Sequence, residues 1–216
     1  MNVSKRHAAW ALLAALAPIL AGCVGAAVVG AGAGALMFAD RRPTETYLAD
    51  EGIEIRTANR IGEKLGNRVH INVTSYNRNV LLTGEVPDAA IKAEVEKITS
   101  GVPNVKAISN ETQISGISAL GARSNDSYIT SKVKARFIDA GQFSPQLVKV
   151  VTEAGAVYLL GIATRREADA AVEIARTTAG VQKVVRVLEI VSEEQARILD
   201  NRPAEAPAEK PAAAKK

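Results

Sequence analysis

The hydrophobic and polar positions of this chain follow one pattern twice. A run of alternating residues ends in Val80-Leu81-Leu82-Thr83-Gly84, and a second run ends in Val157-Tyr158-Leu159-Leu160-Gly161, with the final glycines 77 residues apart. Further along, Gly101-Val102-Pro103-Asn104-Val105 matches Gly180-Val181-Gln182-Lys183-Val184 at a separation of 79 residues. Self-similarity of this extent, with a small insertion between the matched segments, indicates a duplicated domain.

Each copy predicts the same order of elements: helix, strand, strand, helix and strand. The first helix carries apolar residues at helical spacing, which we expect to face a sheet. These residues are Ile53, Ile61 and Leu65 in the first copy and Ile129, Val133 and Phe137 in the second. Alternating positions predict strands over 69–75, 79–85 and 104–114, and then over 147–152, 156–162 and 183–191.

This order predicts an α+β fold with two tandem domains, in each of which two helices pack on a three-stranded sheet. We expect the first domain over 50–115 and the second over 125–191, joined by a linker over 116–124. After the second domain, Ser192 and Gln195 form the pattern of a capping box, which predicts a short helix. The rest of 192–216 is rich in Pro, Ala, Glu and Lys and predicts a disordered tail.

The chain begins with the features of a secretory signal peptide. Lys5 and Arg6 precede an apolar run that ends in Leu20-Ala21-Gly22-Cys23. This ending resembles the lipobox of bacterial lipoproteins, which implies cleavage of the signal peptide 1–22 and acylation of Cys23, the only cysteine in the sequence. The segment 23–49 is then a lipidated Gly/Ala-rich tether. Among lipoproteins with such a box, Val rather than Asp after the cysteine implies transport to the outer membrane.

An uncleaved transmembrane helix is the alternative for the amino-terminal segment. Apolar and small residues continue past Cys23 to Ala39, so the whole run exceeds the length that spans a bilayer. Glycines at positions 25, 30, 32 and 34 lower its helix propensity and favour the tether.

Charge and composition exclude several classes of function. When Lys5 and Arg6 leave with the signal peptide, the formal net charge of +4 falls to +2, too small for non-specific nucleic-acid binding. With Cys23 acylated, the mature chain keeps His70 as its one imidazole and no free thiol, whereas zinc sites and nucleophilic triads need such groups in clusters. We therefore expect no metal, no cofactor and no enzymatic activity, and we interpret His70 as a half-exposed strand residue.

The repeated motif has a resemblance to a known family. A strand ending in Val-x-Leu-x-Gly, an Ala-rich helix and then Gly-Val-x-x-Val resemble the BON domain over about 50–191. The lipobox, the tether and two tandem copies together are similar to outer-membrane lipoproteins of that family, and 124–133 is similar to the opening of their second domain. The helix and strand order also resembles KH modules, but their Gly-x-x-Gly between paired helices is missing.

A candidate binding surface lies on the first helix of the second copy. Tyr128, Lys132 and Arg136 share one face, displaced by one residue from the apolar face that contains Ile129 and Val133. An amphipathic aromatic ring beside cations suits a layer of anionic headgroups. The family resemblance implies that this helix binds anionic phospholipid, and we expect all five residues to contribute.

Two other interpretations remain open for this surface. In the first interpretation, this surface is an ordinary solvated helix face. The equivalent helix of the first copy also carries a basic row, at Arg56, Arg60 and Lys64, so such a row alone does not indicate a binding site. In the second, the protein is an adaptor that docks to outer-membrane assembly or division-site proteins, with Tyr47 and Tyr76 as candidate contacts. The sequence thus predicts a non-enzymatic, periplasm-facing outer-membrane lipoprotein that supports envelope integrity, with the membrane as its main partner.

Overall fold

The computed structural model describes residues 40–118 and 120–202. The predicted signal peptide, Cys23, the tether as far as residue 39 and the tail from residue 203 lie outside the described residues. Within the described part, no helix is both long enough and apolar enough to cross a bilayer.

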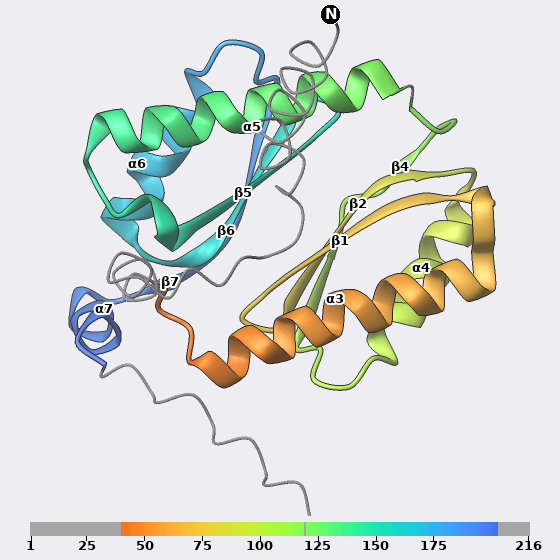
Figure 1. Cartoon of the computed structure of the whole chain (residues 1–216), viewed down its shortest axis with the longest axis horizontal. Helices are drawn as coiled ribbons and strands as arrows, with labels where there is room; N and C mark the ends of the chain where they lie inside the picture. The colour runs from red at the N-terminus through yellow and green to blue at the C-terminus, as the bar shows by residue number, and fades with distance from the viewer. Residues whose placement is uncertain (1–39, 119, 203–216) are drawn as a thin grey trace, which may run out of the picture. The chain divides into compact units, whose positions relative to one another are not determined.

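The first domain contains two helices and a mixed sheet (Figure 1). Its sheet has β1 antiparallel to β2, while β3 and then β4 pair parallel with β2. The elements are α3 (Thr44–Leu65), the 3-10 turn η1 (Gly66–Arg68), β1 (His70–Tyr76), β2 (Asn79–Val86), α4 (Ala89–Ser100), β3 (Ala107–Asn110) and β4 (Gln113–Ile114).

The second domain repeats this arrangement. Strand β6 pairs antiparallel with β5 and parallel with β7, so it is the central strand. The elements are α5 (Leu120–Ala140), the 3-10 turn η2 (Pro145–Leu147), β5 (Val148–Glu153), β6 (Ala156–Thr164), α6 (Arg165–Arg176), β7 (Lys183–Val191) and α7 (Glu193–Asp200). The α+β prediction with two tandem domains is confirmed, and Ser192 caps α7 through the expected capping box with Gln195.

Each domain has a core between its helices and its sheet. The apolar faces predicted for the first helices are buried, and every one of these side chains is at most 4% exposed. In the first domain they pack with Val80, Leu82 and Val95, and in the second with Val157, Leu159 and Ala171. Periodicity along the chain was therefore sufficient to identify the helix side of both sheets.

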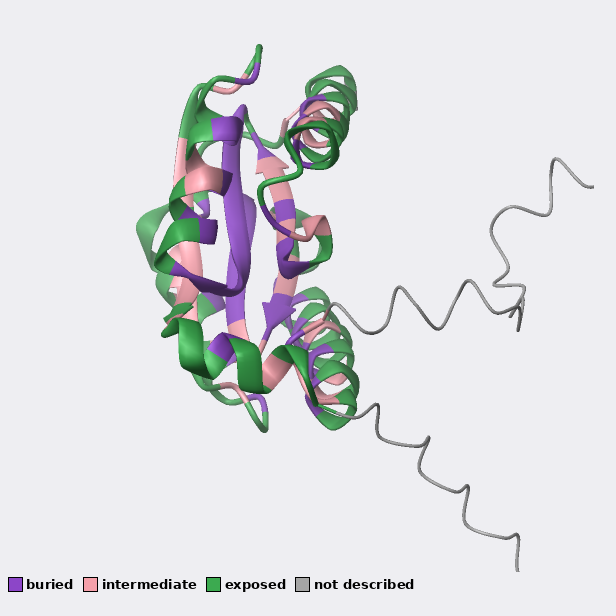
Figure 2. Cartoon of the chain, turned by 90° about the vertical axis from the view of Figure 1, so that its left-hand side faces the viewer, coloured by how far each residue is buried: buried purple, intermediate pink, exposed green. Residues whose placement is uncertain are grey.

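The opposite faces of the two sheets form a third apolar cluster. Tyr76 and Leu81 of the first domain pack with residues of β6, and the cluster members from β6 are Ala156, Tyr158, Leu160 and Ile162. Strand β6 is consequently buried on both faces, and all nine of its residues are buried. Figure 2 shows the buried positions concentrated in the strands, with exposed positions mostly on helices and turns. Near-continuous apolar sequence is typical of such a strand, and the alternation predicted for 156–162 describes only its helix side.

The glycine that ends each repeated strand motif allows a close backbone approach. Gly84 has φ +105°, and a Cβ there would overlap the carbonyl oxygen of His70 on the neighbouring strand. A Cβ on Gly161 would overlap the carbonyl oxygen of Leu147 in the same way. The glycine of the duplicated Val-x-Leu-x-Gly motif is therefore explained by sterics, because neither hairpin has room for a Cβ at this position.

A helical aspartate holds the hairpin turn in each domain. Asp50 of α3 accepts hydrogen bonds from the backbone N–H groups of Asn77 and Arg78, at 2.8 and 2.7 Å. Asp126 of α5 accepts from Ala154 and Gly155, both at 2.9 Å. The four turn residues have positive φ, which leaves their N–H groups outside the strand ladder, so each buried carboxylate satisfies two of them.

The structure corrects the boundaries of the predicted tether and linker. Helix α3 begins at Thr44, and the residues from Asp40 onward are held by ion pairs, so the tether predicted over 23–49 extends too far into the folded part. Helix α5 begins at Leu120, inside the linker predicted over 116–124. Apolar periodicity could not identify the segment from Asp40, because polar contacts, not apolar ones, hold it in place.

Arg41 joins the start of the folded part to the second domain. Its guanidinium donates two hydrogen bonds to Glu167 of α6, at 2.7 and 3.0 Å, and two to Asp200 of α7, at 2.8 and 3.0 Å. A further bond of 3.1 Å reaches the carbonyl oxygen of Ile162. The Arg41 side chain is 3% exposed, so these bonds replace its hydration almost completely.

Arg42 makes the matching contacts in the first domain. Its guanidinium carbon lies 3.9 Å from the centroid of the Tyr76 ring, and it forms ion pairs with Asp40 and Asp50. The adjacent arginines thus fix one short segment to both domains. We refer to Arg41 and Arg42 with their partners as the arginine clamp.

Removal of Arg41 is expected to destabilise the fold. An Arg41→Ala variant leaves the buried Glu167 carboxylate without its cation, which costs on the order of 3 kcal/mol for a buried pair. The check is urea unfolding of the purified chain. The matched control is Arg176→Ala, which removes an ion pair to Glu173 whose side chains are 62% and 58% exposed, and it should change the free energy of unfolding by less than about 0.5 kcal/mol. Equal losses in both variants would contradict a structural role for the clamp.

The stability of the fold should also decrease in acid. Burial alone would raise the pKa of Glu167, but hydrogen bonds from Arg41 and from the backbone N–H of Thr164 outweigh it and lower this pKa below 4.5. A carboxyl group whose pKa is lower in the folded state stabilises that state above the unfolded pKa and loses this contribution as the pH falls through the folded value. We expect the free energy of unfolding to decline below about pH 4.5, more steeply in the wild type than in Glu167→Gln. A parallel decline in both would count against this assignment.

Candidate functional site

The structure divides the five predicted lipid-binding residues into two groups. The Tyr128 side chain extends from α5 into solvent and is 62% exposed. In contrast, Ile129 is 1% and Val133 0% exposed, because both pack in the core of the second domain. The prediction that Ile129 and Val133 contact lipid is therefore wrong. Their contribution is to hold α5 against the sheet.

The two predicted cations both contact the end of α6. Arg136 donates hydrogen bonds of 2.8 Å to the carbonyl oxygen of Ile174 and to the hydroxyl of Thr178. Lys132 donates to the carbonyl oxygen of Ala179, and its Nζ lies 4.6 Å from the centroid of the Tyr128 ring. Cations are favourable where a helix leaves carbonyl groups unpaired. Lys132 remains beside the exposed ring, whereas Arg136 is mainly a structural residue.

Sequence reasoning noted Lys134 near the predicted face but missed one exposed apolar residue of the same helix, Ile138. Ile138 is 67% exposed, and Lys134 is also exposed. Ile138 lies ten residues after Tyr128, or about 2.8 helical turns, so the two side chains leave α5 roughly 80° apart, both on its exposed half. The sequence contains a sign of this, because Ile138 is apolar but does not belong to the series of buried residues Ile129, Val133 and Phe137. We call Tyr128, Lys132, Lys134 and Ile138 the α5 surface.

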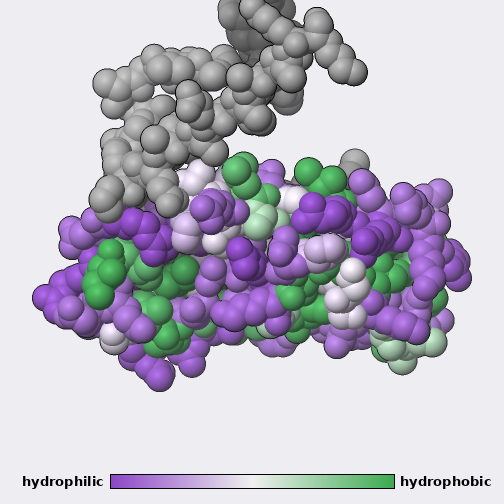
Figure 3. Space-filling model, turned by 90° about the horizontal axis from the view of Figure 1, so that it is seen from below, coloured by the Kyte–Doolittle hydropathy of each residue, from purple (hydrophilic) through white to green (hydrophobic). Residues whose placement is uncertain are grey.

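The two tyrosines proposed as docking residues differ in accessibility. Tyr76 is 4% exposed and lies in the cluster between the sheets, so it cannot form a docking surface. Tyr47 is 46% exposed on α3, where Leu48 and Ile55 are 65% and 59% exposed. Figure 3 shows that hydrophobic side chains on the visible face form separate patches among hydrophilic ones.

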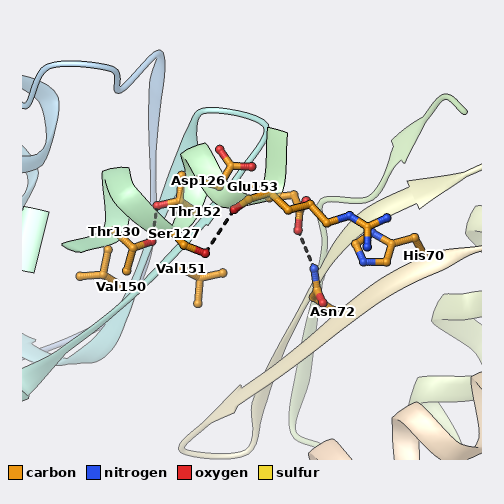
Figure 4. A pocket seen from close by; sticks show the side chains of 10 residues that line it. His70, Asn72, Asp126, Ser127, Thr130, Val150, Val151, Thr152 and Glu153 are labelled. Atoms are coloured by element: carbon orange, nitrogen blue, oxygen red, sulfur yellow. Dashed lines mark hydrogen bonds between the residues drawn. The ribbon is translucent and has the colours of Figure 1, made fainter. Parts of the chain in front are cut away.

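A group of polar and ionisable side chains lies beside a cleft of about 350 Å³ between the two domains (Figure 4). His70 of β1 is half-buried, as predicted for a strand residue, and its Nδ1 lies 2.8 Å from Oε2 of Glu85 on β2. Burial by itself would raise the pKa of Glu85, but hydrogen bonds from Ser118 and His70 hold it below its ordinary value. Glu85 is therefore a buried, ionised carboxylate at neutral pH.

The second domain adds another carboxylate to this group. Oε2 of Glu153, at the end of β5, accepts hydrogen bonds from the Asn72 amide at 2.7 Å and the Thr83 hydroxyl at 3.3 Å. Figure 4 shows Asn72 and Glu153 joined in this way, with His70 nearby. One ligand atom from each of His70, Glu85 and Glu153 lies within 4.8 Å of the others. No sequence pattern indicates this cluster, because Glu153 and His70 belong to different copies.

Comparison with known proteins supplies independent information. The family model of the BON domain matches residues 54–116 and 125–192. The outer membrane lipoprotein DolP of Haemophilus influenzae is 34% identical over 179 residues, which cover 82% of this chain and 93% of that protein. The 21 kDa hemolysin of Actinobacillus pleuropneumoniae is 34% identical over 154 residues, covering 70% of this chain and 79% of that protein.

A solved structure of CdsD, a structural protein of the type III secretion system of Chlamydia trachomatis, covers 69% of this chain and 97% of its own. The TM-score is 0.28 and the identity 14%, and a similarity this low supports no argument about fold or function.

Proposed function

The chain belongs to the BON-domain family, and from this membership we propose that it is an outer-membrane lipoprotein whose second domain binds anionic phospholipid and so supports envelope integrity. The predicted acylation of Cys23 is the anchor in this proposal. The observation that carries the lipid-binding role is the α5 surface, where Tyr128 and Ile138 extend into solvent beside Lys132 and Lys134.

The chemistry of the α5 surface suits a headgroup layer. The Tyr128 ring is amphipathic and the Ile138 side chain apolar, so both gain by entering the boundary between headgroups and acyl chains. Each lysine near an anionic membrane contributes on the order of 1 kcal/mol. Arg136 adds little, because its guanidinium is already bonded to the end of α6.

Contacts of this size are too weak to hold a protein at a membrane alone. Full burial of an Ile side chain contributes about 1.5–3 kcal/mol, and insertion into an interface realises only part of it. An acyl anchor changes the situation, because it makes the encounter intramolecular and raises the effective concentration of the α5 surface at the lipid. In this proposal, acylated Cys23 anchors the protein to the membrane, and α5 orients the second domain against the lipid surface.

The test uses a soluble fragment, Asp40–Lys216, which lacks the anchor and retains every described residue. We expect it to co-sediment with vesicles that contain phosphatidylglycerol and much less with vesicles of phosphatidylcholine alone. The double variant Tyr128→Ser/Lys134→Glu should bind the anionic vesicles about tenfold more weakly, because it loses the ring and reverses a charge. Both side chains are exposed, so the variant should fold normally.

The matched control makes the same kinds of change in the first domain. Ile55→Ser/Arg56→Glu alters one exposed apolar residue and one exposed cation on α3, and its binding should stay within about twofold of the wild type. Equal binding by the α5 variant and the wild type would reject the α5 surface, and equal binding to neutral vesicles would reject anionic selectivity.

An adaptor role is the second candidate, and the exposed apolar residues of α3 favour it. Leu48 and Ile55 lie seven residues apart, hence on one face of the helix, and both are more than half exposed. If this face docks to a protein, a photo-crosslinker at position 48 in cells should give one dominant protein band. That band should persist in Tyr128→Ser/Lys134→Glu, because the two faces are independent. Absence of any protein band from position 48 would remove this candidate.

A further inference from the structure

His70, Glu85 and Glu153 place a nitrogen and two carboxylate oxygens close together where the two domains meet. Their potential ligand atoms all lie within 4.8 Å of one another. Both glutamates are buried, at 5% and 6% exposure, unlike the exposed acidic groups that cluster on many protein surfaces. Two strands of the first domain and one strand of the second supply the three residues.

Arg123 of α5 lines the same cleft and donates hydrogen bonds to Ser118, but among the residues that the structure describes it forms no ion pair with Glu85 or Glu153. Glu153 receives hydrogen bonds from the neutral groups of Asn72 and Thr83, and within residues 40–118 and 120–202 it forms no ion pair. Glu85 has an ion pair with His70, but only when that imidazole is protonated. A buried charge is stable only with a partner of opposite sign or a bound metal.

We propose that His70, Glu85 and Glu153 bind a divalent transition-metal ion that connects the two BON domains. One imidazole nitrogen with two carboxylates is a donor set found around zinc and related ions, whereas calcium and magnesium prefer oxygen ligands alone. The two positive charges of the ion match the two carboxylates. This proposal reverses the expectation from composition, which considered the single histidine without the carboxylates that the fold brings to it.

The surroundings of the cluster meet two further needs of a metal site. Asn72 and Thr83 hold the carboxylate of Glu153, and Ser118 bonds to that of Glu85, so outer groups orient both oxygen ligands. The interdomain cleft, lined by His70, Asn72 and Glu153 among others, gives an ion access from solvent. Ligands of a tetrahedral zinc ion lie roughly 3.3 Å apart, and His70 Nδ1 already lies 2.8 Å from Glu85 Oε2.

The experiment measures binding of Zn²⁺ alone to the full chain, purified in detergent without a histidine tag and first treated with EDTA. Isothermal titration should show one Zn²⁺ per chain. We expect His70→Gln and Glu153→Gln each to weaken this binding at least tenfold, because each removes one ligand. Zn²⁺ should also raise the unfolding temperature of the wild type and not that of either variant, because an ion that binds only the folded state stabilises it.

Glu189→Gln is the matched control. Glu189 accepts a hydrogen bond of 2.7 Å from Asn77 across the same pair of domains, as Glu153 does from Asn72, but it has no part in the His70 cluster. Its Zn²⁺ affinity should equal that of the wild type. No Zn²⁺ binding by the wild type, or equal affinity in the wild type and both ligand variants, would overturn the proposal. Binding of Ca²⁺ as tight as that of Zn²⁺ would overturn the assignment to a transition metal.

A measurement on the wild type keeps the test valid if a ligand variant fails to fold in EDTA. The X-ray absorption spectrum at the zinc edge should indicate nitrogen and oxygen ligands with a single imidazole. Sulfur ligands or several imidazoles would place the ion elsewhere and overturn the proposal. None of these metal-binding measurements involves lipid, so their outcome is independent of the outcome of the vesicle experiment.

Discussion

Burial of β6 on both of its faces is the constraint on which the rest of the described structure depends. One face carries Val157 and Leu159 into the core of its own domain, while the other carries Tyr158 and Leu160 against the first domain. Neither domain alone provides an apolar cover for the second face, so water is excluded only when the two sheets pack together. The domains are therefore a structural unit, and the polar contacts between them, such as Asn72 with Glu153, form at the margin of an apolar interface.

The parts of this fold that the sequence predicts are those with a local signature. Helical spacing identified Ile53 and Phe137 as core residues because a helix repeats its faces within a few residues, and the duplicated glycine identified equivalent strand ends. Contacts between copies have no such signature. Tyr76 looked like a docking residue because nothing nearby in the chain reveals the second sheet that covers it. Arg41 and Glu167 are 126 residues apart, and only the fold brings these charges together.

The same reasoning explains which site residues were predictable. Tyr128 stood out because an aromatic residue on the outer face of a helix is conspicuous in a pattern. Ile129 and Val133 were included wrongly, since one residue of displacement on a helix separates a side chain in solvent from one in the core. The role of Arg136 depends on carbonyl groups at the end of α6, whose position the sequence of α5 cannot reveal. A basic residue beside a candidate surface thus needs its partners identified before it is assigned to a ligand.

The arginine clamp also has a consequence for the proposed lipid anchor. In the proposal that Cys23 carries a lipid anchor, 17 residues separate it from Asp40, and a chain of this length spans at most roughly 60 Å when fully extended. A tether that continued to residue 49 would reach roughly 90 Å. Because Arg41 and Arg42 hold 40–43 against both domains, they shorten the chain that could separate Cys23 from these domains. Under the same proposal, a force on the anchor would pass to both domains through Arg41 and Arg42 before it reached the first turn of α3.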